Sequence, residues 1–323
     1  MSRVPLWLCI VTACAADEAA PAGPVADTGM ASVPTSHTTD DDEPGDDDDG
    51  APDETTQPSP GCGGVVPPSP YELALDHEGV TRHAIIDLPS DYDGTDPVPL
   101  VLNFHGAATT ASAHRAYTKL HTAASSRGWI AVHPDGTQRT WDYLSESRDI
   151  RFVDALMTEL GQVLCLDERR LYATGLSNGG YFSYQLACDR GERIAAIAPV
   201  AGGDVSIGCD PGVFIPVLHL HGTDDAIVPY DGNALIPSAE QSVSRWADKV
   251  NACVTDPLPA FELGAVHCER WSCRPDDEEA TLCTVEGGGH TWPGAAPLPL
   301  LGPTNQDIDA TEQILDFFAR WSR

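Results

Sequence analysis

Short apolar runs and helical repeats alternate along residues 71–323. The clearest repeat spaces its apolar residues by three and four positions: Ile150, Val153, Met157, Leu160 and Leu164. The pattern predicts helices at 111–127, 149–164, 178–190 and 306–321. It predicts strands at 71–75, 81–88, 100–104, 129–132, 171–174, 194–200, 213–219 and 281–285. Such alternation is typical of an α/β fold, in which helices cover both faces of a mostly parallel sheet, and about 250 residues suit one domain of this kind.

The charge of the chain argues against two classes of partner. Its 49 Asp and Glu residues outnumber its 18 Lys and Arg residues, for a net charge of −31. Residues 1–60 alone hold thirteen of the acids and a single base, Arg3. Nucleic acid binding requires a basic face, and anionic lipid attracts polybasic segments. No run reaches the roughly 18 apolar residues of a membrane-spanning helix. We therefore expect no nucleic acid partner and no spanning helix.

Residues 1–14 are typical of an export signal. Arg3 precedes an apolar run at 4–13 that is too short to cross a bilayer. The run ends in Val-Thr-Ala-Cys, which resembles the lipobox of bacterial lipoproteins and predicts lipidation of Cys14. Cleavage after Ala13 or Ala16 is the alternative, and it would leave a soluble secreted protein. Either way, we expect the protein outside the cell or on its surface.

Residues 15–70 predict a disordered linker between this signal and the folded domain at 71–323. The segment is rich in Asp, Pro and Thr, with acidic runs at 40–43 and 46–49. It has too little apolar surface to offset the entropy of folding, and its like charges keep it extended. A calcium site is the alternative, but the alternating ligands of an EF-hand loop are missing.

The cysteines fit export. If Cys9 lies in the signal and Cys14 carries lipid, eight remain: Cys62, Cys165, Cys188, Cys209, Cys253, Cys268, Cys273 and Cys283. An even number in an oxidising compartment predicts up to four disulfides, although the pairing stays open. Paired Cys-x-x-Cys knuckles are absent from the sequence, so a zinc site is not expected.

A G-x-S-x-G motif at 175–179 stands between a predicted strand and a predicted helix. This is the setting of a nucleophile elbow, in which the serine occupies a tight turn and its neighbours must be small. The motif alone is a weak signal, and a glycine-rich turn with an idle serine is the alternative. The setting favours Ser177 as a nucleophile.

A serine nucleophile requires a base, and α/β-hydrolases place an acid and then a histidine after the serine. The histidines after Ser177 are His219, His221, His267 and His290. His290 follows a Glu-Gly-Gly-Gly loop that lets the backbone turn the ring back over the nucleophile, so we expect His290 to be the base. His219 and His221 are expected to shape a strand end rather than to bind metal.

The acid is expected on the loop after the strand at 213–219, where Asp224 and Asp225 both fit by position. We favour Asp225 as the group that holds one imidazole tautomer and stabilises the imidazolium. The developing oxyanion requires backbone N–H donors. We expect these from Asn178, at the start of a helix, and from Ala107, in the loop after the strand at 100–104.

These residues lie in segments that resemble the extracellular polyhydroxybutyrate depolymerase and feruloyl esterase family, which is related to carbohydrate esterase family one. The matching segments are LVLNFHG (100–106), HPDGT (133–137), LYATGLSNGGYFSYQLAC (171–188), AAIAPVAGG (195–203), LHLHGTDDAIVPYDG (218–232) and GGGHTWPG (287–294). The resemblance implies an α/β-hydrolase fold with Ser177 as nucleophile, Asp225 as acid and His290 as base. It also implies Ala107 and Asn178 as oxyanion donors.

Two departures from the family pattern stand out. Residues 107–110 read Ala-Ala-Thr-Thr where the family often has Cys or Gly after His-Gly, and residues 141–151 are unusually charged for a stretch beside the substrate cleft. Trp141 and Trp292 are candidates to line the substrate pocket, and packing of a loop is the alternative for each.

The resemblance implies a serine carboxylic ester hydrolase that uses an acyl-enzyme and needs neither metal nor cofactor. No separate binding module is visible, which favours feruloyl or acetyl esters of plant-cell-wall oligosaccharides as substrates. Hydrolysis of 3-hydroxybutyrate oligomers is the first alternative, and a non-catalytic surface lipoprotein with a hydrolase fold is the second. We expect a monomer whose activity falls on the acid side, near the imidazole pKa of about 6.5.

Overall fold

The computed structural model describes residues 57–206, 208–249, 253, 256–273 and 279–323. The predicted export signal, Cys14 and most of the predicted linker lie outside the described residues. Within the described part, no helix is both long and apolar enough to cross a bilayer.

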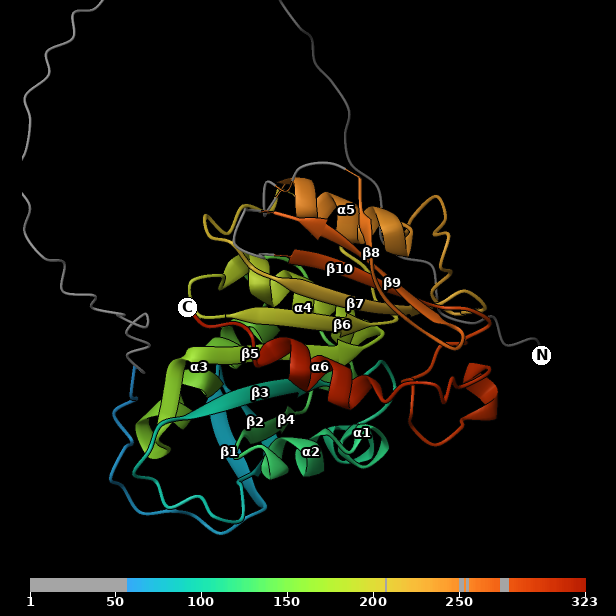
Figure 1. The fold of residues 1–323 in the computed structure, drawn as a ribbon. Helices are drawn as coiled ribbons and strands as arrows, with labels where there is room; N and C mark the ends of the chain where they lie inside the picture. Colours follow the sequence, from blue (N-terminus) through green and yellow to red (C-terminus); the bar gives the residue numbers. More distant parts are fainter. Residues whose placement is uncertain (1–56, 207, 250–252, 254–255, 274–278) are drawn as a thin grey trace, which may run out of the picture. The chain divides into compact units, whose positions relative to one another are not determined.

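The described chain forms a ten-stranded sheet with the order β1-β2-β4-β3-β5-β6-β7-β10-β9-β8 (Figure 1). The strands are β1 (Tyr71–His77), β2 (Val80–Asp87), β3 (Val98–Phe104), β4 (Ile130–Pro134), β5 (Leu166–Leu176), β6 (Ala196–Val200), β7 (Val217–Gly222), β8 (Leu258–Leu263), β9 (Val266–Ser272) and β10 (Glu279–Val285). The central strands β4, β3, β5, β6, β7 and β10 are parallel, whereas the outer strands pair antiparallel. The central strands are almost wholly buried, which explains their continuous apolar runs in the sequence.

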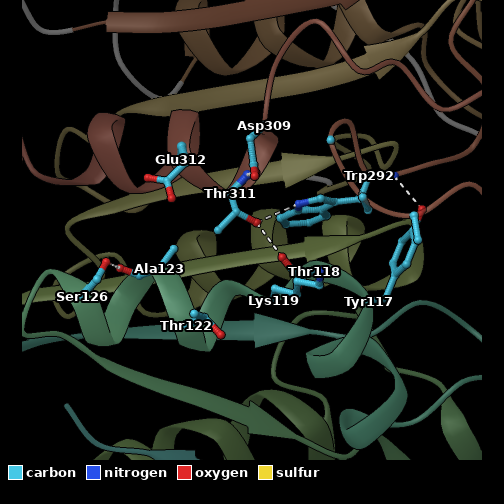
Figure 2. Close-up of a pocket in the computed structure, with 13 residues that line it drawn as sticks. Tyr117, Thr118, Lys119, Thr122, Ala123, Ser126, Trp292, Asp309, Thr311 and Glu312 are labelled. Carbon is cyan, nitrogen blue, oxygen red and sulfur yellow. Dashed lines mark hydrogen bonds between the residues drawn. The ribbon is translucent and has the colours of Figure 1, made fainter. Parts of the chain in front are cut away.

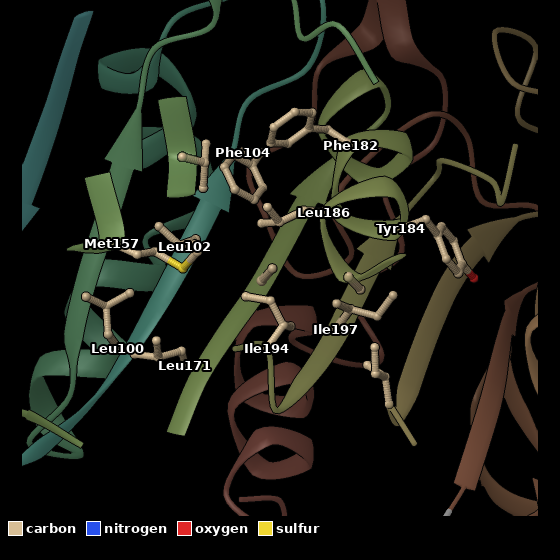
Figure 3. Packing of buried hydrophobic residues seen from close by; sticks show 14 of the residues in the cluster. Leu100, Leu102, Phe104, Met157, Leu171, Phe182, Tyr184, Leu186, Ile194 and Ile197 are labelled. Carbon is tan, nitrogen blue, oxygen red and sulfur yellow. The ribbon is translucent and has the colours of Figure 1, made fainter. Parts of the chain in front are cut away.

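Helices pack on both faces of the sheet. They are α1 (Ala111–Thr118), α2 (Leu120–Ser126), α3 (Arg148–Val163), α4 (Asn178–Asp189), α5 (Ala239–Lys249) and α6 (Ala310–Phe318). Residues of α3, α4 and α5 join one buried apolar cluster, part of which is drawn in Figure 3. Residues of α2 and α6 join a second buried apolar cluster, to which the strands contribute different residues. The predicted fold class, a mostly parallel sheet covered on both faces, is confirmed.

The predicted helix at 111–127 is wrong in one respect, because it is two helices. Lys119 separates α1 from α2 with a left-handed backbone, φ 52°. The carbonyl of Thr118 accepts a hydrogen bond from the Thr311 hydroxyl at 2.9 Å, instead of continuing the helical ladder. The last residue of α1 is therefore bonded to a partner from α6, far along the chain.

Three elements were not predicted: α5, β8 and β9. Strand β8 is exposed along its whole length and has no buried face, so its sequence shows no alternation of apolar and polar residues. Two predicted elements begin four residues later than expected. Strand β7 begins at Val217, and α6 begins after Asp309, whose carboxylate accepts the Thr311 N–H at 2.9 Å and caps the helix.

Four disulfides pair all eight cysteines considered in the sequence. They are Cys62–Cys165, Cys188–Cys209, Cys253–Cys273 and Cys268–Cys283. The first joins the chain before β1 to Cys165, the residue just before β5, and the same segment adds hydrogen bonds between Ser59 and both Leu164 and Leu166. Contacts with the sheet thus begin before Tyr71, the residue at which the sequence predicts the folded domain to start.

The parallel strands bring distant loops to one edge of the sheet. Phe104 at the end of β3 pairs with Gly175 of β5, and Val285 at the end of β10 pairs with Gly222 of β7. The loops that follow these strands carry the predicted site residues. Ligand sites of open α/β sheets form at this carboxyl edge.

Candidate active site

Ser177 occupies a strained turn between β5 and α4. Its backbone has φ 59° and ψ −119°, a region that residues other than glycine rarely adopt. Its N–H donates to the Val200 carbonyl of β6 at 2.8 Å, which helps to hold the turn. Such strain costs on the order of 1–3 kcal/mol and persists where the surrounding structure imposes it. The predicted strand–turn–helix setting of the motif is confirmed.

The glycines on either side of Ser177 are required by close backbone contacts. A Cβ on Gly175 would lie 2.6 Å from the Phe104 carbonyl oxygen, and a Cβ on Gly179 would lie 2.2 Å from the same atom. Both distances are shorter than any side chain tolerates. The turn is therefore packed directly against the end of β3, and only glycine fits at these two positions.

Asp225 and His290 form a buried pair. His290 Nδ1–H donates to Asp225 Oδ2 at 2.7 Å, and the two residues are only 4 % and 5 % exposed. The carboxylate accepts the hydrogen bond from Nδ1–H. In the neutral ring the other nitrogen, Nε2, therefore carries no proton and can accept one. The residues predicted as acid and base are thus in contact, and their catalytic roles stay a prediction.

The Asp225 carboxylate is held ionised. Its Oδ1 accepts the N–H groups of Ile227 and Val228, both at 2.8 Å. Burial alone would raise the pKa of Asp225, but the hydrogen bonds from His221 and His290 outweigh it, together with the His290 charge and the Val228 N–H. The pKa therefore lies below its usual value, which suits a group that must stay charged beside an imidazolium.

Asp224, the other candidate acid, is placed differently. Its side chain is exposed, and its backbone N–H donates to the Gly288 carbonyl at 2.9 Å. This contact ties the loop after β7 to the loop that carries His290. A Cβ on Gly222 would lie 2.2 Å from the Gly288 carbonyl oxygen, so the two loops approach as closely as backbone allows.

His221 also contacts Asp225, with Nε2 at 3.4 Å from Oδ2. Its Nε2 lies 2.8 Å from the Val228 carbonyl, and its Nδ1 lies 3.0 Å from His219 Nε2. Both ring nitrogens of His221 are therefore occupied within the fold. His290, which uses only Nδ1 in this way, is the better candidate for the base.

The loop after β3 lies against the nucleophile. A Cβ on Gly106 would lie 3.5 Å from Ser177 Cβ. Asn178 is the first residue of α4, so its N–H has no acceptor within the helix. Ala107 is exposed next to Gly106. The N–H of the following residue, Ala108, donates to the backbone carbonyl of Arg139 at 2.8 Å. The two predicted oxyanion donors therefore belong to neighbouring segments, and their role stays a prediction.

Trp141 is buried and connects these two segments. Its N–H donates to Asn178 Oδ1 at 2.6 Å, and its carbonyl accepts Asn178 Nδ2–H at 3.0 Å. Its indole Nε1–H donates to the His105 carbonyl at 3.0 Å. The ring packs edge-on against Phe104 at 5.1 Å between centroids. The sequence missed this connection, and the proposed contact of Trp141 with substrate stays a prediction.

Trp292 is 1 % exposed and lies two residues after His290. Its Nε1–H donates to Thr311 Oγ1 at 3.0 Å, and the ring borders a pocket of about 320 Å³ between α1, α2 and α6 (Figure 2). The lining residues do not include Ser177, Asp225 or His290. A role of Trp292 in binding the substrate at Ser177 also stays a prediction.

Tyr181, one helical turn after Ser177, was not singled out in the sequence. Its N–H donates to the Ser177 carbonyl at 3.0 Å, and its ring stacks on Tyr143 at 5.4 Å between centroids. Burial, with Tyr143 and Asp225 nearby, raises the pKa of Tyr181. Among the described residues, no hydrogen-bond partner reaches its hydroxyl. The aromatic pair thus connects the first turn of α4 to the segment between β4 and α3.

Comparison with known proteins identifies the family. No family model matches the chain. Feruloyl esterase B of Piromyces equi is 29 % identical over 230 residues, 65 % of this chain and 42 % of that protein. Probable feruloyl esterase C of Aspergillus niger is 32 % identical over 237 residues, 71 % of this chain and 83 % of that protein. The chain belongs to the feruloyl esterase family.

Some of the relatives are longer than the region that the chain matches. A bifunctional acetylxylan esterase/xylanase of Neocallimastix patriciarum is 31 % identical over 253 residues, 76 % of this chain but 34 % of that protein. The chain thus spans less than half of this relative and of the Piromyces relative. The family resemblance predicted from the sequence motifs is confirmed.

Solved structures support an α/β-hydrolase fold for this chain. Acetyl xylan esterase from Aspergillus awamori has a TM-score of 0.56 at 14 % identity, covering 77 % of this chain and 99 % of that chain. A thermostable esterase has a TM-score of 0.50 at 19 % identity, covering 78 % of this chain and 63 % of that chain. At these identities, the likeness concerns the fold.

Proposed function

We propose that the protein is a serine carboxylic ester hydrolase that acts through an acyl-enzyme. The observation that carries the proposal is the buried His290–Asp225 hydrogen bond of 2.7 Å, in a chain whose Ser177 stands on a strained elbow. The proposed nucleophile, acid and base follow one another along the chain as Ser, Asp and His, which is the order of α/β-hydrolases.

In the acylation step, His290 Nε2 takes the proton of Ser177 Oγ while Oγ attacks the ester carbonyl carbon. Asp225 keeps Nδ1 protonated and stabilises the imidazolium that forms. His290 then gives its proton to the leaving alcohol as the carbon–oxygen bond breaks, which leaves the acyl group on Ser177. In the second step, water attacks the acyl carbon and loses a proton to His290. The bond between that carbon and Ser177 Oγ then breaks, His290 returns the proton to Oγ, and the carboxylic acid leaves.

The negative charge of the tetrahedral intermediate requires donors that are already in place. We assign this role to the N–H groups of Asn178 and Ala107. The close approach of Gly106 to the Ser177 Cβ supports the assignment, because the loop after β3 then lies next to the Ser177 side chain. Trp141 supports it further by bonding to both Asn178 and the His105 carbonyl.

The substrate class rests on the relatives. Feruloyl esterases and an acetylxylan esterase/xylanase are among the proteins to which the chain is similar. We therefore assign to this chain the cleavage of feruloyl or acetyl esters on plant-cell-wall oligosaccharides. Four disulfides support export into an oxidising compartment. A lipid anchor at Cys14 is part of the same proposal.

The test compares the full chain with Ser177→Ala on methyl ferulate, acetylated xylan and 3-hydroxybutyrate oligomers. We expect turnover of the feruloyl or acetyl ester, a loss of at least about a thousandfold in Ser177→Ala, and covalent labelling of Ser177 by a fluorophosphonate. Turnover of the hydroxybutyrate oligomers alone would overturn the substrate assignment and keep the mechanism. A folded chain that turns over none of them and is not labelled would overturn the hydrolase proposal in favour of a binding protein.

A further inference from the structure

A line of buried hydrogen bonds runs from α4 through β7 to the proposed catalytic acid. Tyr184 Oη lies 2.9 Å from His219 Nδ1, and His219 Nε2 lies 3.0 Å from His221 Nδ1. His221 Nε2 then lies 2.8 Å from the Val228 carbonyl and 3.4 Å from Asp225 Oδ2. His221 Nε2 thus bonds to the loop backbone and also lies within contact distance of the carboxylate.

The two histidines are placed by the strand itself. His219 and His221 are two residues apart on β7, so their side chains leave the same face of the sheet. The rings stack at 5.3 Å between centroids with 6° between their planes. Both residues are buried, as is Tyr184, whose hydroxyl points away from the apolar side chains labelled in Figure 3. Three polar side chains thus lie next to one another in the interior.

The proton positions follow from the acceptors when both rings are neutral. The Val228 carbonyl can only accept, so His221 Nε2 carries a proton and His221 Nδ1 accepts. His219 Nε2 then donates to it, and His219 Nδ1 accepts from Tyr184. Burial, with His221 next to it, holds the pKa of His219 well below its usual value. Burial, followed by the charge of Asp204, holds the pKa of Tyr184 well above its usual value.

Each N–H or O–H in this arrangement points toward Asp225. Hydrogen bonds in such a chain polarise one another, which strengthens the last donor. Asp225 Oδ1 is fixed by two backbone N–H groups, whereas Oδ2 is contacted by His290 and by His221. Among these contacts, only His221 and His290 reach Asp225 Oδ2, the oxygen that bonds to the base.

We propose that His221, braced by His219 and Tyr184, is a positioning residue that fixes Asp225 Oδ2 for its hydrogen bond to His290. The inference rests on the proposed function, in which Asp225 orients the base. Loss of the His221 donor frees one side of the carboxylate, so Oδ2 no longer has a single position. The His290 ring then follows the carboxylate, and Nε2 is less often aligned with the serine oxygen.

The sharpest test pairs two substitutions at one position in the full chain. His221→Gln keeps an amide N–H able to reach the Val228 carbonyl and Asp225, whereas His221→Leu has a similar volume and no donor. We measure kcat and KM on the ester that the wild type hydrolyses, with kcat expressed per site titrated by fluorophosphonate. We expect His221→Leu to lose about 10- to 100-fold in kcat with KM within about twofold, because small misplacements cost this much. His221→Gln should recover most of the loss.

A second variant keeps the test decisive if His221→Leu does not fold. Tyr184→Phe removes only the hydroxyl at the far end of the chain and keeps the ring that packs in the core. We expect kcat per titrated site to fall by about three- to tenfold, since the polarisation of both histidines is lost. A purely structural role would lower the melting temperature and the number of titrated sites while leaving kcat per site unchanged.

Three outcomes overturn the inference. They are wild-type kcat per site in His221→Leu, no recovery in His221→Gln, and an unchanged kcat per site in Tyr184→Phe. Failure of the proposed function would look different, because the wild-type chain itself would then neither turn over an ester nor label at Ser177.

Discussion

Trp141 and Asn178 hold each other through two hydrogen bonds, one in each direction, at 2.6 and 3.0 Å. Asn178 directly follows the proposed nucleophile, and Trp141 belongs to the connection between β4 and α3. The Asn178 side chain is occupied by this pairing, which leaves its backbone N–H for the developing oxyanion. The pair therefore fixes the start of α4 and, through the Trp141 indole, the His105 carbonyl of the loop after β3, which are the two segments that carry the proposed oxyanion donors.

Asn178→Ala tests this relationship. The variant keeps the backbone N–H but frees the Trp141 loop, so we expect kcat to fall by about 10- to 100-fold with a smaller change in KM. Thr140→Val is the matched control, since it removes only the Thr140 hydroxyl bond to Asn178 Oδ1 at 3.1 Å. Steady-state kinetics on the hydrolysed ester give both values. Equal, small losses in the two variants would contradict the role of the pair.

The two neighbouring aspartates give a direct comparison. Asp225→Asn replaces the charge that His290 bonds to, and we expect kcat to fall by about 10⁴, as when the acid of another serine hydrolase triad is replaced by its amide. Asp224→Asn changes an exposed side chain, so its kcat should stay within about twofold of wild type. Both variants are assayed at the pH of maximal activity. A large loss in Asp224→Asn with an active Asp225→Asn would reverse the assignment.

Gly179 tests the packing of the elbow separately from its chemistry. A Cβ at this position would lie 2.2 Å from the Phe104 carbonyl oxygen, so Gly179→Ala has to move α4 or β3. We expect a loss of at least about 3 kcal/mol in the free energy of unfolding, together with loss of activity. Gly161→Ala is the control, because its Cβ would meet its neighbours only at 3.5 Å or more within α3. That variant should be neutral or more stable by up to about 1 kcal/mol in urea unfolding. Similar unfolding energies for both would contradict the close approach.

Local patterns in the sequence were enough to predict much of the fold and the order of the candidate site. The central strands are buried on both faces and read as apolar runs, and the elbow, the acidic loop and the glycine-rich loop are each contiguous segments. Other features depend on partners far along the chain. Thr311 bonds to the carbonyl just before the break at Lys119, and Trp141 bonds to the Asn178 side chain. The sequence predicts His219 and His221 only as residues that shape the end of a strand. Their contacts with Tyr184 and Asp225 follow from the fold.

Buried histidines predict a loss of stability in mild acid. His114 is buried beside His105, and burial followed by the charge of that neighbour lowers its pKa to about 3. Burial also lowers the pKa of His105, and lowers those of His133 and His219 well below the usual value. In the unfolded chain each imidazole titrates near its usual pKa of about 6.5. Between this pH and the lower folded values, the unfolded state binds more protons than the folded state.

The free energy of unfolding should therefore decrease as the pH falls below about 6.5, by up to about 1.4 kcal/mol per pH unit for each such histidine. Asp225 acts in another window, since its lowered pKa contributes stability that is lost only below its unfolded value of about 4. Urea unfolding at about pH 7 and about pH 5, with the disulfides intact, separates the two. His114→Gln, which keeps a side-chain donor for the Asn103 Oδ1 that His114 Nε2 contacts at 2.9 Å, should reduce the difference between these two measurements. A free energy of unfolding that is the same at both pH values in the wild type would contradict neutral, buried histidines in the folded state.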